Sequence, residues 1–219
     1  MRSRTLIPIV CAAAAALFAV ETVKTPINND DVRVLDVVLQ PHEKTSMHEH
    51  TVNRVMIYRN AGSQKFEYAD GRHTVLSFRE NEVKWSPVEG KHIAEVSTEK
   101  PVNLIEIEAK KAAAGKKVTS AIDPVKIDPQ HYKVEFENSQ VRVLHAKIEP
   151  HGVALLHEHS LNRVTVFLTD QEFRVTDSQG KVDIVKHKAG EAIWGTPITH
   201  TEENLSDQPF EVVAVELKN

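Results

Sequence analysis

Cysteine is nearly absent from this chain, since Cys11 is the only one and lies in the first twenty residues. If that stretch is removed on export, the mature chain cannot form disulfides, thiolate metal ligands or a cysteine nucleophile. Basic runs are absent too, and 27 Lys and Arg residues face 31 Asp and Glu residues. Such a mildly acidic chain is a poor candidate for binding nucleic acid. Long helical periodicity is also missing, which argues against a partner helix or zipper.

The first twenty residues have the layout of a secretory signal peptide. "MRSR" provides a positive start, "TLIPIVCAAAAALFA" an apolar stretch, and small residues follow near Ala16 and Ala19. The apolar stretch is too short for a comfortable membrane span. The sequence therefore predicts an exported protein, periplasmic or secreted, with no stable membrane span. An uncleaved N-terminal anchor is the alternative.

The rest of the chain consists of two similar copies of one segment. Across residues 32–55, twelve of the 24 residues are identical to those at 141–164. The match resumes at Trp85 and Trp194, and the two copies end alike, as "IEAK" and "VELK". Chance does not produce this spacing, so the chain is a tandem duplication. We expect a signal peptide at 1–20, a first domain at 21–110, a linker at 111–128 and a second domain at 129–219.

Each copy consists of short segments in which apolar and polar residues alternate. Examples are "VRVLHAKI", "RVTVFL", "EFRVTD" and "FEVVAVEL", and Gly, Pro, Asp or Asn separates such segments roughly every 8–12 residues. This pattern is typical of an antiparallel β-sandwich or β-barrel. Between the copies, "KKAAAGKKVTSAIDP" is poor in bulky apolar residues and predicts a linker with at most a turn of helix.

Histidines recur at matching positions of the two copies. "HEHTVNR" begins at residue 48 and "HEHSLNR" at residue 157. On a strand, residues i and i+2 face the same side, so two imidazoles of each segment can converge on one cation. A third histidine follows each repeated tryptophan by six or seven residues. The predicted metal ligands are His48, His50 and His92 in the first copy and His157, His159 and His200 in the second.

Both copies resemble the cupin superfamily, and the whole chain is therefore similar to a bicupin. "GVALLHEHSLNR", from Gly152, resembles the first cupin motif with one residue fewer before the histidines, and "GEAIWGTPITHTEEN", from Gly190, resembles the second. The first copy is looser, with Lys44 and Val96 where a glycine and an asparagine stand in the motifs. The resemblance implies an all-β chain of two tandem jelly-roll barrels, each a double-stranded β-helix that can hold a ligand inside.

One position departs from the cupin pattern in both copies. Arg54 and Arg163 stand where a glutamate usually completes the metal site. A guanidinium is always charged and cannot be a metal ligand. Each arginine is expected either to form an ion pair with a nearby carboxylate, such as Glu49 or Glu158, or to bind an anionic ligand beside the metal.

Two further features bear on the site. Trp85 and Trp194 are expected to pack in the core and to form part of the pocket wall. Glu202 lies two residues beyond the third histidine of the second copy and can face the same side, as an additional ligand. The first copy has Ala94 at that position, which weakens this interpretation.

A three-histidine site suits a divalent transition metal, with Fe2+ expected first and Zn2+, Ni2+, Cu2+ or Mn2+ as alternatives. Some cupin oxygenases, notably thiol dioxygenases and a diketone-cleaving type, use three histidines, so the resemblance implies a dioxygenase acting on a small molecule, including an anionic one. The alternatives are a non-catalytic barrel that binds a small ligand or metal, a non-redox isomerase and a storage protein. The sequence identifies no catalytic residue, and a homo-oligomer stays open.

Overall fold

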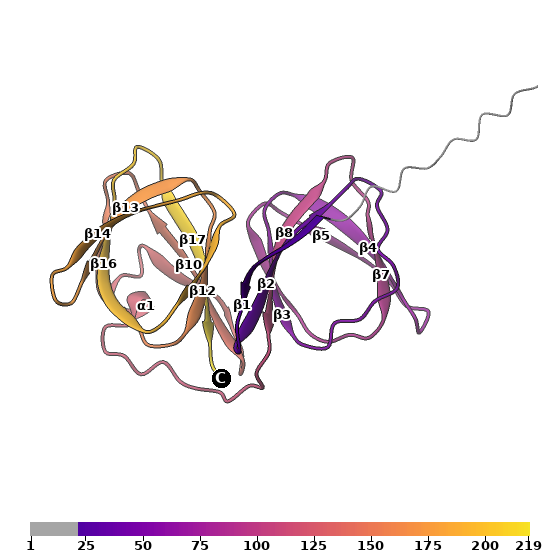
Figure 1. Cartoon of the computed structure of the whole chain (residues 1–219), viewed down its shortest axis with the longest axis horizontal. Helices are drawn as coiled ribbons and strands as arrows, with labels where there is room; N and C mark the ends of the chain where they lie inside the picture. The colour runs from indigo at the N-terminus through magenta and orange to yellow at the C-terminus, as the bar shows by residue number, and fades with distance from the viewer. Residues whose placement is uncertain (1–21) are drawn as a thin grey trace, which may run out of the picture.

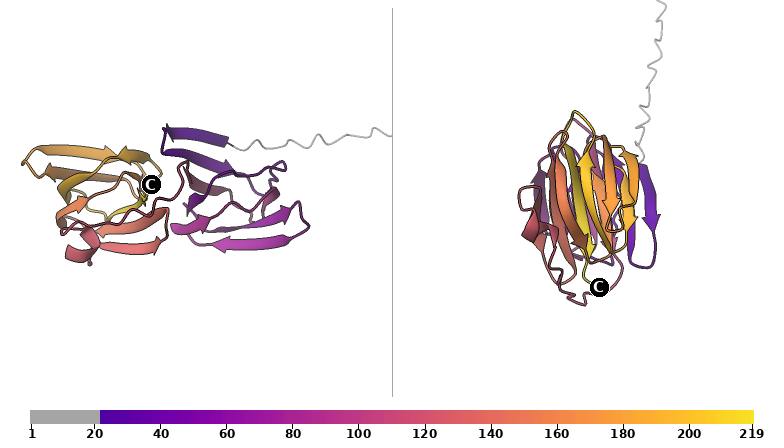
Figure 2. Two further views of the ribbon diagram at one scale, coloured as in Figure 1. Left: turned by 90° about the horizontal axis from the view of Figure 1, so that it is seen from below. Right: turned by 90° about the vertical axis from the view of Figure 1, so that its left-hand side faces the viewer.

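The computed structural model describes residues 22–219, so the expected signal peptide at 1–20 lies outside the described residues. Two β-barrels lie side by side in this part of the chain (Figure 1), as the view from below also shows (Figure 2, left). Across residues 22–219, no helix is long and apolar enough to cross a bilayer. The prediction of an all-β chain with two tandem jelly-roll barrels is confirmed.

The first barrel is formed by a five-stranded sheet, in the order β1-β2-β8-β3-β6, and a three-stranded sheet, in the order β5-β4-β7. Its strand pairs are antiparallel. The strands are β1 (Thr22–Asn28), β2 (Val32–Leu39), β3 (Arg54–Tyr58), β4 (Gly62–Tyr68), β5 (His73–Phe78), β6 (Glu82–Ser86), β7 (His92–Val96) and β8 (Val102–Ala109).

The second barrel repeats this plan with a five-stranded sheet, β15-β12-β17-β10-β9, and a four-stranded sheet, β11-β16-β13-β14. A four-residue helix, α1 (Pro124–Ile127), precedes it. The strands are β9 (Tyr132–Glu137), β10 (Val141–Ile148), β11 (Val153–His159), β12 (Arg163–Phe167), β13 (Gln171–Asp177), β14 (Val182–His187), β15 (Ala192–Gly195), β16 (Ile198–Asn204) and β17 (Phe210–Leu217).

The two five-stranded sheets share one hydrophobic core. Strand β3 shows why, because all five of its residues are buried. Val55 and Ile57 point into the core that both barrels share, whereas Met56 and Tyr58 point into the core of the first barrel. A strand buried on both faces carries apolar residues on both faces. The shared core comprises Val32, Val34, Val55, Ile57, Ile105, Ile107, Val141, Val143, Val164, Val166, Val213, Val215 and Leu217.

Polar contacts surround this shared core. The Asn53 side-chain amide donates to Gln140 Oε1 at 2.9 Å, and the Gln140 amide donates to the Lys111 carbonyl at 2.7 Å. At another point Arg59 donates to the Ala189 carbonyl at 3.1 Å. The neighbouring Gly190 has a φ of 89°, and a Cβ there would lie 2.2 Å from Arg59 Cζ. Glycine is therefore required where the first barrel approaches the backbone of the second.

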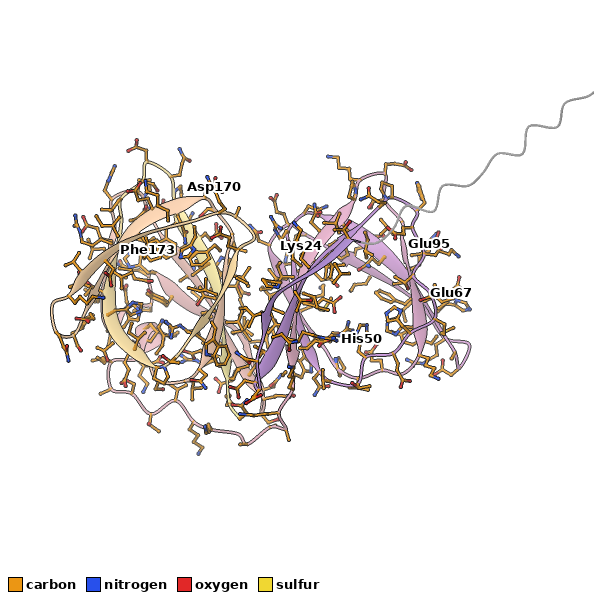
Figure 3. The ribbon with its side chains drawn as sticks, in the orientation of Figure 1. Lys24, His50, Glu67, Glu95, Asp170 and Phe173 are labelled. Carbon is orange, nitrogen blue, oxygen red and sulfur yellow. The ribbon has the colours of Figure 1, made fainter. Side chains whose placement is uncertain are left out.

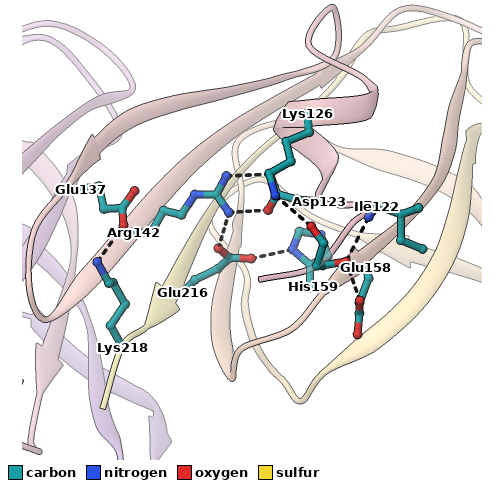
Figure 4. Close-up of polar contacts among 10 residues, drawn as sticks. Ile122, Asp123, Lys126, Glu137, Arg142, Glu158, His159, Glu216 and Lys218 are labelled. Atoms are coloured by element: carbon teal, nitrogen blue, oxygen red, sulfur yellow. Dashed lines mark hydrogen bonds and ion pairs between the residues drawn. The ribbon is translucent and has the colours of Figure 1, made fainter. Parts of the chain in front are cut away.

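The C-terminal part of the segment between the copies packs on the second barrel. Asp123, which is 2% exposed, accepts two hydrogen bonds from Arg142, at 2.6 and 2.9 Å (Figure 4). The Ser120 hydroxyl donates to Glu158, one of the carboxylates considered as a partner for an arginine. Pro124 begins α1, a position where its missing N–H costs nothing. The segment is thus anchored by a buried ion pair.

The shared core predicts a strong dependence of stability on its side chains. Ile107→Ala removes a fully buried side chain and should lower the free energy of unfolding by about 2–5 kcal/mol. Ile184→Ala is the matched control, because Ile184 is 57% exposed on β14; its effect should stay within about 0.5 kcal/mol. Urea unfolding measures both. Equal effects would show that the contact between the two sheets contributes little.

Candidate metal centres

The three predicted ligands of the first barrel lie together. His48 and His92 form a two-way backbone bridge, with N···O distances of 3.0 and 2.8 Å. His50 follows on the same segment, and its Nε2 lies 3.2 Å from His48 Nε2. One ring nitrogen of each histidine lies within 4.8 Å of the others. Residues 40–53 contain no named strand, so this bridge, and not a regular strand, fixes the position of the first two histidines.

Backbone carbonyls orient two of these rings. His48 Nδ1 lies 2.8 Å from the Ser46 carbonyl, and His92 Nδ1 lies 3.1 Å from the Gly90 carbonyl. A carbonyl only accepts, so Nδ1 carries the proton in both rings and Nε2 keeps its lone pair. In metal sites, the second ring nitrogen commonly makes this kind of contact. The two rings are therefore set up to ligate through Nε2.

The second barrel repeats the triangle with greater burial. His157 and His159 are on β11, His200 is on β16, and His157 pairs directly with His200. All three are at most 5% exposed, and their ligand nitrogens lie within 4.8 Å of one another. The ring centroids are 4.5, 5.1 and 5.7 Å apart, against 4.6, 4.9 and 5.5 Å in the first barrel. The duplication has preserved one geometry twice.

A buried carboxylate orients His159. Its Nδ1 lies 2.9 Å from Glu216 Oε1, and Glu216 Oε2 accepts from Arg142 at 3.2 Å (Figure 4). His157 Nδ1 contacts the Leu155 carbonyl at 2.7 Å. A carboxylate behind a histidine fixes the ring and raises its basicity as a ligand. Glu216 was not predicted from the sequence, although it lies in "VELK", the repeat of "IEAK".

The first barrel has a glutamate at the position that corresponds to Glu216, but its contacts differ. Glu108 corresponds to Glu216, because Arg54 and Arg163 pair with these two residues across the sheets. Arg33 binds Glu108 with two hydrogen bonds, at 2.5 and 2.8 Å. Glu106, Glu108 and His50 also form a group whose ligand atoms lie within 4.8 Å. Two carboxylates therefore lie next to one ligand histidine.

Burial favours the neutral form, which metals bind, in four of the six imidazoles. Burial, with help from the charge of Arg54, lowers the pKa of His50 to about 3. Burial likewise lowers the pKa of His200 to about 4 and that of His159 well below its ordinary value. Both ring nitrogens of His200 are buried without a hydrogen-bond partner. Buried polar atoms almost always have partners, so the His200 ring fits a bound cation, and the donor set suits a divalent transition metal.

Arg54 forms an ion pair, but with neither carboxylate considered from the sequence. Its Nη1 donates to Glu106 at 3.0 Å and its Nη2 to Ser86 at 2.8 Å. The side chain is 7% exposed, and its Nε is buried without a partner. Glu49 is exposed, and Glu158 binds Ser120. One buried N–H of this charged group is thus left without an acceptor.

Arg163 has lost both of those partners. Ser86 and Glu106 are replaced by Gly195 and Ala214 at the corresponding positions of the second barrel. Arg163 donates instead to the Thr196 carbonyl at 2.8 Å. Its guanidinium lies over Gly195, where a Cβ would come within 3.0 Å of it. The two repeated arginines therefore have different surroundings.

A cavity of about 510 Å³ opens onto the first triad. Arg54, Trp85 and all three histidines line it, and Figure 3 shows His50 on the inner side of the first barrel. Trp85 also packs against the core that the barrels share, as does Trp194 in the second barrel. Apolar walls are provided by Leu35, Leu39, Met56, Phe66, Leu76 and Leu104. The cavity combines an apolar wall with several polar and charged groups, among them Lys84, Glu89 and Glu106.

No protein-family model and no curated protein sequence matches this chain. Solved structures do match. AerE from Microcystis aeruginosa has a TM-score of 0.67 at 10% identity, with 93% of this chain and 95% of that chain covered. Oxalate decarboxylase from Bacillus subtilis has a TM-score of 0.64 at 14% identity, with 90% and 72% covered, and that enzyme contains Mn(II) centres. These similarities support a cupin-like fold.

The lowered histidine pKa values predict a loss of stability in acid for the metal-free chain. Below about pH 6.5 this histidine takes up a proton in the unfolded chain, whereas buried His200 of the folded chain does so only near pH 4. The free energy of unfolding therefore decreases as the pH falls from about 6.5 toward 4. From pH 7 to 5 this amounts to about 1–2 kcal/mol per histidine. Urea unfolding of the wild type and of His200→Gln measures it.

The wild type must be compared with His200→Gln because Glu216 also changes its protonation in this pH range. Burial raises its pKa to about 7, so the folded chain retains a proton there and gains stability as pH falls from 7. Both proteins contain Glu216, and the difference between them isolates His200. The wild type should lose more stability than His200→Gln between pH 7 and 5. An equal loss in the two proteins would contradict the assignment.

Proposed function

We propose that each barrel binds a divalent transition metal through its three histidines and that the chain acts on a small molecule in the first barrel, most plainly as a dioxygenase. The observation that supports this is a triad of converging imidazoles which borders a cavity of about 510 Å³. A bound Fe2+ ion would supply open coordination positions and one-electron chemistry. The protein supplies the ligands, the binding cavity and the charged groups around them.

Arg54 is the residue that would orient the small molecule. Arg54 lines the cavity, its charge acts on His50, and its buried Nε has no acceptor, so its guanidinium would attract a carboxylate or other anionic oxygen. The apolar wall would hold the body of the ligand and exclude water. A small molecule with one acidic group and an apolar part fits both features.

A non-catalytic binding barrel is the second candidate. The carboxylates around the cavity are already engaged, since Glu106 binds Arg54 and Glu89 accepts from Tyr68 at 2.6 Å. None of these groups stands out as a free general base, which also leaves a non-redox isomerase with less support. Saturable binding of a small molecule without turnover or oxygen consumption would favour the binding barrel.

We also propose that the chain is exported, because its first twenty residues have the layout of a signal peptide. N-terminal sequencing of the protein recovered from a bacterial periplasm tests this. A new N-terminus near residue 20 is expected. Recovery of the intact chain in the cytoplasm would contradict the proposal.

Metal content tests the proposed centres. The wild type, purified from the periplasm without chelator, should contain about two metal ions per chain, because each barrel holds a complete group of three converging histidines. His48→Ala and His157→Ala should each contain about one, as measured by inductively coupled plasma mass spectrometry. Ile184→Ala is the control for handling losses. A wild-type chain that stays free of metal after soaking in Fe2+ would overturn the proposed function.

Arg54→Gln tests the predicted ligand chemistry. Benzoate is a suitable probe, because it joins one carboxylate to an apolar ring. The substitution removes a charge-assisted hydrogen bond, so the dissociation constant for benzoate should rise about 10- to 100-fold. Arg163→Gln is the matched control in the second barrel and should change it little. Isothermal titration calorimetry of the metal-loaded chain measures both, and an unchanged constant for Arg54→Gln would refute the assignment.

A further inference from the structure

A tyrosine hydroxyl faces the histidine triad of the second barrel. Tyr132, at the start of β9 and 2% exposed, donates from its hydroxyl to Glu202 Oε2 at 2.8 Å. The hydroxyl oxygen of Tyr132 also lies 3.3 Å from His157 Nε2. His157 Nδ1 is occupied by its contact with the Leu155 carbonyl, so Nε2 carries no proton. Two lone pairs therefore face each other, an arrangement that a cation placed between them would satisfy.

Glu202 supports the same conclusion. Its carboxylate takes part in none of the ion pairs among residues 22–219, and the Tyr132 hydroxyl is its one side-chain hydrogen-bond donor there. It lies near His157 and His200, whose ring nitrogens are the predicted ligands. A carboxylate inside a barrel without a cationic partner is costly. Arg163 acts on Glu202 through its charge but forms no ion pair with it, and a metal ion at the triad would supply further positive charge.

The first barrel has neither group. Val23 corresponds to Tyr132, because they pair with the equivalent residues Val37 and Ala146. Ala94 corresponds to Glu202, since each lies two residues after the third histidine of its triad. Both Val23 and Ala94 line the cavity of the first barrel. The hydroxyl and the carboxylate of the second barrel are therefore replaced by apolar side chains of the cavity wall in the first.

We propose that Tyr132 Oη is an internal fourth donor to the metal of the second barrel, held in place by Glu202. This inference rests on the metal binding of the proposed function and adds that the two metal centres have different roles. The second centre has its own protein donor at the position that an external ligand would take, whereas the first centre leaves that position open to the small molecule. Glu202 also provides the negative charge that the replacement of glutamate by Arg163 removed.

The experiment uses the full chain with the first triad disabled by His48→Ala and His92→Ala, so that Co2+ enters only the second barrel. In this background Tyr132→Phe should weaken Co2+ affinity about 10- to 100-fold, as measured by competition with a chelator. It should also open the centre to azide, which would then change the visible spectrum of the bound Co2+. With Tyr132 present, azide should leave that spectrum unchanged.

Controls separate this inference from the proposed function. Tyr58→Phe removes another buried hydroxyl, in the first barrel, and should leave Co2+ affinity unchanged. Glu202→Gln leaves the Tyr132 ring in place and should weaken Co2+ binding even if Tyr132→Phe folds poorly. Equal affinity and an equal azide response with and without Tyr132 would overturn the inference and leave the proposed centres standing. Absence of Co2+ from the wild-type chain would instead overturn the proposed function itself.

Discussion

The packing of one five-stranded sheet against the other is the contact on which both sites depend. Strands β3 and β12 alternate between the shared core and the interior of their own barrel, so that burying Val55 or Val164 in the shared core also fixes its neighbours. Among those neighbours are Arg54 and Arg163, the first residues of the two strands. The hydrophobic contact between the barrels thus holds in register the strands that carry the charged groups of each site.

The fold and the two groups of three histidines could be predicted from the sequence because they depend on local spacing and on the repeat. Period-two alternation marks strands, and two histidines separated by one residue share a face wherever the backbone is extended. The partners of the arginines could not be predicted. Arg54 meets Glu106 on β8, 52 residues away, and this pairing follows from the order of strands in the sheet. Glu216 was missed for the same reason, because its contact with His159 spans 57 residues.

The duplication has kept the triads and changed their surroundings. The ring separations of the two triads differ by only a few tenths of an ångström. Around them, Val23 and Ala94 of the first barrel become Tyr132 and Glu202 in the second. Packing constrains the scaffold strongly, whereas a side chain that points into a cavity is free to change. Two copies with the same three histidines can therefore take different roles.

Charge balance separates the two sites further. In the first barrel, Arg33 and Arg54 are matched by the two carboxylates that they bind. In the second, Arg142 and Arg163 face three carboxylates, because Asp123 and Glu216 bind Arg142 and the charge of Glu202 acts on Arg163. A divalent ion would therefore leave more uncompensated positive charge in the first barrel than in the second. An anionic ligand gains most where positive charge is least compensated, and the cavity that can admit one lies in that same barrel.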